Sequence, residues 1–179
     1  LEVGIGSGLN LPYYDHSKID QIWGLDPSEE LSVMAKETAK EEGLEINFIS
    51  CGAEEIPLPD NHFDSVLITY TMCTIKEVIR ANMEIKRVLK KNAKGIVQVP
   101  FYHPIPENTI EDKSVVSKKE RELLYGQSDH VRKYGYDYKK RLESTGLNVK
   151  VKKPNLFLTD SEMKKYCIIR SEDLYIISK

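Results

Sequence analysis

The sequence predicts an α/β protein with a parallel, doubly wound sheet. Segments typical of strands alternate with segments typical of helices through residues 1–100, a pattern that indicates parallel strands with helices on both faces. Residues 63–70 are nearly continuous in apolar and β-branched side chains, as expected of a strand that is covered on both sides. A glycine-rich loop, Gly4 to Gly8, follows the first strand directly. This loop indicates a tight turn at the start of the sheet.

The first two strands flank the glycine loop. Residues 1–5 form the closing half of a buried strand, so we expect further residues upstream of Leu1 in the natural protein. A brief helix starts at Leu9, and Pro12 confines it to its opening turn or displaces it, because proline has no backbone N–H. The second strand is predicted over residues 21–25.

The next helix begins where the second strand ends. The sequence Asp-Pro-Ser-Glu at residues 26–29 places proline at the first helical position and has the spacing of a capping box. Gly43 ends this helix. Residues 45–50 then alternate as a third strand. The apolar face of the helix is predicted to consist of Leu31, Met34, Ala35 and Ala39.

A second helix joins the fourth strand, residues 63–70, to the fifth. Its apolar side chains recur at helical spacing and stop in a polar turn predicted over residues 90–94. The fifth strand follows over residues 95–99. The helical stripe is formed by Val78, Ala81, Ile85, Val88 and Leu89.

The alternation breaks after Pro100. Residues 101–134 contain prolines, charges and one helical candidate at residues 117–125, so we expect an insertion that acts as a lid. Residues 135–179 resume the pattern of helices and strands. Their predicted elements are a helix over 137–145, a strand over 147–152, a helix from the capping box at 159–162 and a last strand over 174–178.

The whole chain, residues 1–179, fits a single domain. It has 40% hydrophobic and 30% charged residues, the composition of a globular protein. No run of eighteen apolar residues is present, so we expect no bilayer span and no membrane partner. The formal charge of -2 disfavours a nucleic-acid partner, which would need clustered lysines and arginines. A small or neutral partner is favoured.

The three cysteines are far apart in the sequence. Cys51, Cys73 and Cys167 form no Cys-x-x-Cys pair, and no histidine lies at metal-ligand spacing from them. We therefore expect no metal site and no disulfide framework. Such thiols are typical of a reducing compartment, most simply the cytoplasm.

A carboxylate at the end of the second strand complements the glycine loop. Asp26 follows Gly8 by eighteen residues, a position from which it can bind both ribose hydroxyls of an adenosine. The helix predicted after the loop would aim its N–H groups at a carboxylate. Leu9 stands where the loop of dinucleotide enzymes needs a glycine. The loop therefore fits S-adenosylmethionine better than NAD, although Asp26 could serve only as a helix N-cap.

Four segments match the motifs of one enzyme family. They are residues 1–8, 24–28, 53–60 with 63–66, and 87–90 with 98–100. On these segments the chain resembles the class I S-adenosylmethionine-dependent methyltransferases, in the branch that includes the ubiquinone and menaquinone biosynthesis C-methyltransferases. The resemblance implies a Rossmann-like sheet of seven strands with an antiparallel last strand. It also implies S-adenosylmethionine as cofactor, a small-molecule methyl acceptor, and an N-terminal helix that this sequence lacks.

The resemblance also assigns roles to site residues. Glu2 would help to hold the methionine amino group, and the glycine loop would wrap the methionine and the ribose. Asp26, followed by Pro27, would bind the ribose hydroxyls. No catalytic base is assigned. The other assignments are Gly4, Gly6, Ser7 and Gly8 in the loop, Ala53 and Glu54 beside the adenine, and Thr69, Tyr70 and Thr71 toward the methionine end and the acceptor.

Two departures from the family pattern stand out. Gly52 occupies the position at which many relatives have an aspartate on the adenine amino group. Residues 91–93 replace a Pro-Gly-Gly turn. Because of the first departure, backbone groups would have to recognise the adenine. The second departure changes a surface loop.

Further candidates lie outside these motifs. Residues 127–135 form either a pocket wall with a histidine as proton acceptor or a hydrogen-bonded loop anchor. Cys73 is expected to be a buried, unreactive thiol, since no histidine is near it in sequence. Tyr102 and His103 follow the fifth strand, where an acceptor can bind. The polar residues of the segment at 127–135 are Asp129, His130, Arg132 and Tyr134.

Two other functions stay open at this point. The loop and acid are shared with nicotinamide-dependent oxidoreductases, although this chain lacks their third glycine. A non-catalytic protein could also keep the fold as a cofactor sensor or partner-binding module.

Overall fold

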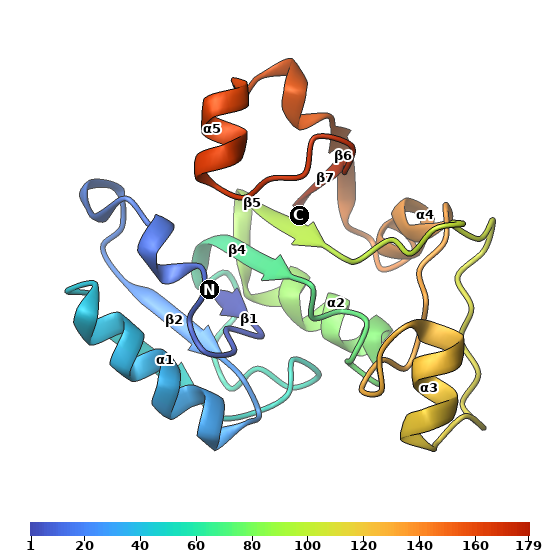
Figure 1. Ribbon diagram of the computed structural model, residues 1–179. Helices are drawn as coiled ribbons and strands as arrows, with labels where there is room; N and C mark the ends of the chain where they lie inside the picture. The colour runs from blue at the N-terminus through green and yellow to red at the C-terminus, as the bar shows by residue number, and fades with distance from the viewer.

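The computed structural model describes residues 1–179 and contains one seven-stranded sheet (Figure 1). Its strands are β1 Glu2–Val3, β2 Ile22–Leu25, β3 Ile46–Ile49, β4 Phe63–Thr69, β5 Leu89–Gln98, β6 Asn148–Lys152 and β7 Leu174–Ser178. Their order across the sheet is β3-β2-β1-β4-β5-β7-β6. Neighbours from β3 to β5 are parallel, whereas β7 is antiparallel to both β5 and β6. The predicted doubly wound sheet with an antiparallel last strand is confirmed.

Helices cover both faces of this sheet. They are α1 Glu29–Glu41, α2 Val78–Val88, α3 Lys118–Tyr125, α4 Tyr138–Glu143 and α5 Asp160–Lys165. Ala39 of α1 packs with Ile46 and Phe48, while Ile49 packs with the cluster that contains α2 and α4. Because successive strand side chains point to opposite faces, α1 lies on one face and α2 and α4 lie on the other. Figure 1 shows α1 and α3 at opposite ends of the molecule and α5 at its top.

The larger hydrophobic core lies between the sheet and the helices α2 and α4. Val78, Ala81, Ile85 and Val88 of α2 are all buried in it, as the helical spacing predicts. A valine or isoleucine side chain stabilises the fold by about 1.5–3 kcal/mol when fully buried. This face of the sheet therefore holds the carboxyl ends of β1 and β4 in fixed positions.

The prediction of a turn over residues 90–94 is wrong. These residues are part of β5, which begins at Leu89 immediately after α2. Lys94 pairs with Ser65, but Leu89 pairs with Phe63, so the ladder contains an irregularity between them. The side chains here are largely solvated, and a solvated, irregular strand end has the composition of a turn.

The brief helix predicted after the glycine loop is present only as a 3-10 turn and not as an α-helix. The chain forms two single 3-10 turns, Leu11–Tyr13 and His16–Lys18. Pro12 lies in the first turn, and the Asp15 side chain accepts a hydrogen bond from Ser17 N at 3.1 Å to start the second. The helix end that was expected to face a bound carboxylate is therefore absent.

The predicted apolar face of α1 is only half right. Ala35 and Ala39 are buried, but 37% of Leu31 and 50% of Met34 are exposed. The reason is close packing: a β-carbon built on Gly8 would lie 3.3 Å from Cα of Ala35. Only small side chains fit between α1 and the glycine loop.

Candidate functional site

The glycine loop folds back onto the end of β2. Gly4 N and Ile5 N both donate to Leu25 O, at 2.7 and 3.2 Å. The φ angles of Gly4, Gly6 and Gly8 are 70°, 56° and 84°, values that L-residues with a side chain rarely adopt. The spacing of these glycines therefore builds a bend that brings the loop beside the residue after β2.

Asp26, the residue after β2, binds this loop directly. Its Oδ2 accepts a hydrogen bond from Gly6 N at 3.1 Å, and its Oδ1 accepts one from Ser28 N at 2.9 Å. Ser28, whose Oγ accepts from Leu31 N, is the N-cap of α1. The alternative in which Asp26 is only a helix cap is therefore wrong. The loop and the carboxylate converge, as the adenosine-site hypothesis requires.

The glycines of the loop differ in the space around them. A β-carbon on Gly4 would overlap the Thr71 side chain, and one on Gly8 would lie 2.7 Å from Leu11 Cδ1. A β-carbon on Gly6 would meet nothing within 4 Å. Gly4 and Gly8 are thus required by internal packing, whereas the open space lies at Gly6, beside the Asp26 carboxylate. This is the space in which a ligand can reach the backbone.

Glu2 lies under the loop and is only 1% exposed. Its carboxylate accepts hydrogen bonds from Asn10 Nδ2 and from Tyr14 Oη, both at 2.7 Å. Asn10 Nδ2 also donates to Thr69 Oγ1 at 3.0 Å. Burial raises the pKa of Glu2, and the two hydrogen bonds oppose that rise. A polar chain thus joins the first strand to the end of β4.

The residues after β4 form the other wall of the site. Tyr70 adopts a φ of 55°, a strained conformation that is often found at functional positions. Its hydroxyl donates to Glu172 Oε2 at 2.9 Å. Burial, together with the nearby carboxylate, raises the pKa of Tyr70 to about 12. Thr71 packs against Gly4 and donates to Thr69 O at 3.1 Å.

The segment after β3 completes the same edge of the sheet. Asp26 N donates to Ile49 O at 3.2 Å, so this segment starts beside Asp26. Ala53 is buried, and the Glu54 carboxylate accepts from Glu77 N at 3.4 Å. A β-carbon at Gly52 would lie 2.5 Å from Oε2 of Glu54. The Glu54 carboxylate therefore occupies the space next to Gly52 that an aspartate side chain would need.

The comparisons with known proteins agree with this geometry. Residues 1–97 match the model of the methyltransferase domain family. This chain belongs to that family. The match covers β1 to β4 and all but the last residue of β5, and hence the glycine loop, Asp26 and the end of β4.

Relatives and solved structures point the same way. The chain is 34% identical over 99 residues to a phosphatidylethanolamine N-methyltransferase of Cereibacter sphaeroides. The aligned region covers 54% of this chain and 48% of that protein. It is 30% identical over 77 residues to a ubiquinone/menaquinone biosynthesis C-methyltransferase of Cupriavidus necator. This aligned region covers 43% of this chain and 32% of that protein. An S-adenosylmethionine-dependent methyltransferase from Mesorhizobium loti superimposes with a TM-score of 0.66 at 14% identity, over 99% of this chain and 89% of that one.

The extent of these matches limits what they show. The chain spans about half the length of the curated relatives it matches, or less. At 14% identity, the likeness to the Mesorhizobium loti structure shows the fold alone.

In this methyltransferase-family chain, the segment at 127–135 is a loop anchor. The Arg132 guanidinium is fully buried and donates to Met72 O and Ile75 O, both at 2.6 Å. The Tyr134 hydroxyl donates to Met72 O at 3.1 Å. Arg132 also forms an ion pair with Glu111 at 2.8 Å. Arg132 and Tyr134 thus fix the loop that follows β4, next to the candidate site.

Cys73 has a histidine neighbour that sequence distance concealed. Its Sγ lies 3.2 Å from His130 Nε2, and both residues are buried. Burial raises the pKa of the Cys73 thiol to about 12 and lowers the pKa of His130. Both groups are therefore neutral at pH 7, which supports the expectation of an unreactive thiol although the argument from sequence distance is wrong.

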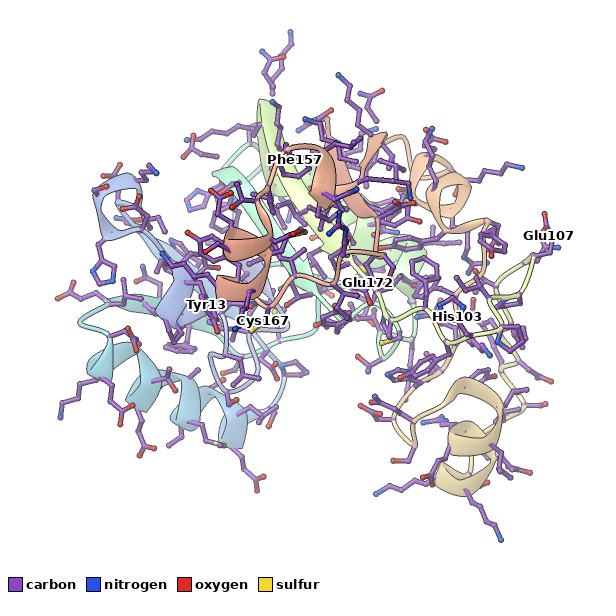
Figure 2. The ribbon with its side chains drawn as sticks, turned by 45° about the horizontal axis from the view of Figure 1, so that its top comes forward. Tyr13, His103, Glu107, Phe157, Cys167 and Glu172 are labelled. Atoms are coloured by element: carbon purple, nitrogen blue, oxygen red, sulfur yellow. The ribbon has the colours of Figure 1, made fainter.

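The two candidates after β5 do not join the glycine loop. The Tyr102 ring lies 6.0 Å from the His130 ring and packs on Gly126. His103 is exposed, and Figure 2 shows it on the side of the molecule that carries Glu107, away from Tyr13. The structure therefore gives neither residue a place beside Asp26.

The connection between β6 and β7 reaches the site instead. The Tyr166 ring packs edge-on against Tyr13 with centroids 6.1 Å apart. The Tyr13 hydroxyl lies 3.8 Å from Cys167 Sγ, and Figure 2 shows these two residues together. Together with the bond between Tyr70 and Glu172, these contacts bring residues 166–172 to the wall of the site. No motif signals this approach, because Glu172 is 102 residues from Tyr70.

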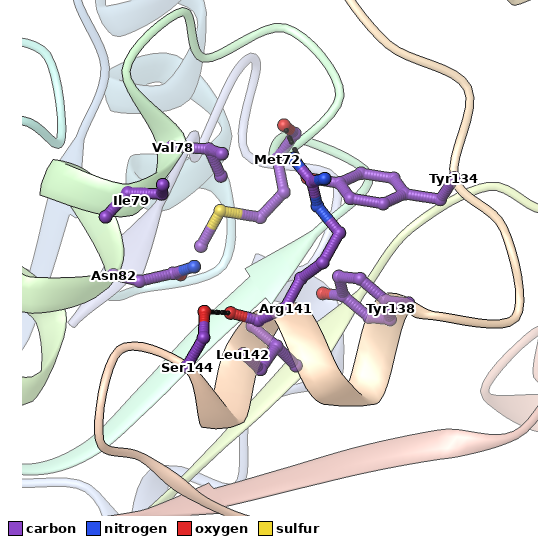
Figure 3. Close-up of a pocket in the computed structure, with 9 residues that line it drawn as sticks. All are labelled: Met72, Val78, Ile79, Asn82, Tyr134, Tyr138, Arg141, Leu142 and Ser144. Carbon is purple, nitrogen blue, oxygen red and sulfur yellow. Dashed lines mark hydrogen bonds between the residues drawn. The ribbon is translucent and has the colours of Figure 1, made fainter. Parts of the chain in front are cut away.

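Two hollows are lined by residues other than Gly4 to Gly8 and Asp26, although Glu2 and Tyr14 line the wider one. A cavity of about 110 Å³ lies between α2 and α4 and contains the unpaired Oδ1 of Asn82 and the unpaired hydroxyl of Tyr138 (Figure 3). A wider hollow of about 460 Å³ lies over the sheet face that carries Leu67 and Ile96. No group of three or more His, Cys, Asp and Glu side chains gathers where it could hold a metal ion. None of the helices combines the length and the apolar character that crossing a bilayer requires.

Proposed function

We propose that this chain is the catalytic domain of a methyltransferase that uses S-adenosylmethionine and acts on a small-molecule acceptor. The observation behind this proposal is the hydrogen bond that joins Gly6 to Asp26 at a position where an added β-carbon would meet nothing within 4 Å. The family match over residues 1–97 supports the same function. No observation favours the oxidoreductase or the non-catalytic alternative, and Leu9 still replaces the glycine that a dinucleotide loop needs.

The residues present fit the proposed cofactor. Each Asp26 oxygen accepts one backbone hydrogen bond and keeps a lone pair with which it can accept from a ribose hydroxyl. The loop from Gly4 to Gly8, which includes Ser7, would surround the ribose and the methionine. Ala53 and Glu54 would border the adenine. Pro27 would shape the bend after Asp26.

The groups at the end of β4 would act on the methionine end. Glu2 would bind the amino group, since a buried carboxylate is stabilised by a cation. Thr69, Tyr70 and Thr71 would face the methyl group and the acceptor. When bound, S-adenosylmethionine supplies an activated methyl group, and the protein contributes alignment and exclusion of water.

The acceptor is proposed to be lipid-soluble. The relatives described above are named for phosphatidylethanolamine and for the biosynthesis of ubiquinone and menaquinone. We further propose that residues 101–134 select the acceptor as a lid, together with residues 166–172, which contact Tyr13 and Tyr70. The scattered cysteines support a reducing compartment, so we place the protein in the cytoplasm.

Calorimetric titration with S-adenosylmethionine, and with NADH as the competing ligand, tests the cofactor. We expect heat with S-adenosylmethionine alone. Transfer of a radiolabelled methyl group to extracted polar lipids and to quinols then tests the acceptor. Binding of NADH without binding of S-adenosylmethionine would refute the proposal, whereas cofactor binding without transfer to either lipid class would refute only the acceptor.

A further inference from the structure

We propose that the connection between β6 and β7 docks this protein on a negatively charged lipid surface. We call residues 150–170 the basic-aromatic patch. The sequence led us to expect no membrane partner. This inference differs from that expectation, because it gives the protein contact with one leaflet of a bilayer. It concerns a surface that adjoins the site through Tyr166 and Cys167, and its test does not depend on methyl transfer.

The first support for this proposal is a set of large apolar side chains in solvent. The exposed fraction is 78% for Leu156, 52% for Phe157 and 52% for Ile169. Leu156 ends the 3-10 turn Pro154–Leu156, and Ile169 lies in the turn after α5. This 3-10 turn packs against α5, so the apolar groups belong to one region of the surface, at the top of Figure 1. Gathered, exposed apolar groups indicate an interaction site.

The second support is charge. The patch contains six lysines and arginines and two acidic residues, in a chain whose net charge is -2. Lys153 and Arg170 form ion pairs with Asp173 and Asp160. The remaining lysines form no ion pair, and they are Lys150, Lys152, Lys164 and Lys165. A local positive surface with free ammonium groups is complementary to anionic lipid headgroups.

The third support is the way in which the two kinds of side chain are combined. Lys152 Nζ lies 5.6 Å from the centre of the Phe157 ring, and Lys165 Nζ lies 5.1 Å from the centre of the Tyr166 ring. Aromatic rings with ammonium groups beside them are typical of the boundary between acyl chains and headgroups. Single-stranded nucleic acid can also stack on such rings. Leu156 and Ile169 have aliphatic side chains, which neither stack on bases nor bind phosphates, so a lipid surface fits better.

The position of the patch gives docking a purpose. Tyr166 contacts Tyr13, which follows the glycine loop, and Glu172 binds Tyr70 at the end of β4. Figure 2 shows Phe157 on the same connection as Cys167 and Glu172. A lipid-soluble acceptor could therefore pass from a bilayer to the site without crossing water.

Sedimentation with vesicles tests the proposal. The probes are vesicles of phosphatidylcholine alone and vesicles with 40% phosphatidylglycerol, at low and at high salt. We expect binding to the anionic vesicles only, weakened by salt. Since each lysine near an anionic surface contributes about 1 kcal/mol, K152E and K164E should each weaken binding at least about fivefold. F157S should weaken it about tenfold.

The helix α3 offers matched controls. Leu123 is 80% exposed and Lys119 is also exposed. Both belong to α3, which lies far from α5 and the patch (Figure 1). L123S and K119E should leave vesicle binding unchanged, and thermal melts should show that all variants are folded. The proposal is overturned if wild-type protein does not bind anionic vesicles, if the α3 variants lose as much binding as the patch variants, or if single-stranded DNA binds the patch more tightly than the vesicles do.

Discussion

Substitution of Gly6 by alanine separates cofactor binding from folding. Gly6 has a φ of 56°, and a β-carbon there would meet nothing within 4 Å. The fold should therefore lose only the cost of a left-handed alanine, about 1–2 kcal/mol. In a chain of 179 residues this corresponds to a fall in Tm of about 2–8 °C. The hydrogen bond from the residue 6 amide to Asp26 is retained, because alanine keeps the N–H.

The ligand, in contrast, should lose its space. If the open volume beside Asp26 holds the cofactor, the added methyl group overlaps it, and the Kd for S-adenosylmethionine should rise at least tenfold, about 1.4 kcal/mol. Gly43 provides a matched control, because it has a φ of 66° and nothing within 4 Å of a built β-carbon, at the far end of α1. G43A should lose similar stability and bind normally. Titration calorimetry and thermal melts measure both effects, and unchanged binding by G6A, or an equal loss in G43A, would refute the reasoning.

Three smaller predictions follow from buried polar groups. Burial raises the pKa of Glu2, so its contribution to stability is complete below the usual carboxyl range and is lost as pH rises through the folded-state pKa. In urea titrations, the stability of wild type relative to E2Q should therefore fall from pH 4 to pH 8. A difference that stays constant with pH would contradict this. Cys73, with a pKa raised to about 12, should resist iodoacetamide at pH 8 while exposed Cys167 reacts, and equal labelling by mass spectrometry would contradict its burial. The buried hydroxyl of Tyr138 has no hydrogen-bond partner, so Y138F should leave the free energy of unfolding unchanged or raise it by up to about 1 kcal/mol. In a denaturant titration, a decrease of more than about 1 kcal/mol would show that the hydroxyl has a partner.

The parts of the fold that follow local rules could be predicted from the sequence. The strand before Gly4, the capping box at Thr159 and the buried stripe of α2 depend on residues close together in the chain, and all three are present. The polar end of β5 could not be predicted, because pairing with β4 overrides the preference of its exposed lysines. The same holds for Leu31, whose exposure depends on how closely α1 approaches the glycine loop.

The candidate site divides in the same way. Asp26 could be predicted from the sequence. The glycine loop follows β1 and Asp26 follows β2, and because these two strands are parallel neighbours, their carboxyl ends lie side by side. Asn10 was missed although it lies two residues after Gly8 and joins Glu2 to Thr69, because an asparagine in a loop has many uses. Glu172 was missed because only the antiparallel return of β7 brings it to Tyr70.

The central claim is that one adenosyl ligand occupies the space between the glycine loop and the end of β2. Backbone amide NMR during titration with S-adenosylhomocysteine tests it most directly. The largest shift changes should occur at Gly4, Gly6, Gly8 and Asp26, because a ligand in that space alters the bond between Gly6 N and Asp26. Shifts confined to other regions, such as the cavity between α2 and α4, with these four amides unmoved at saturation, would contradict it.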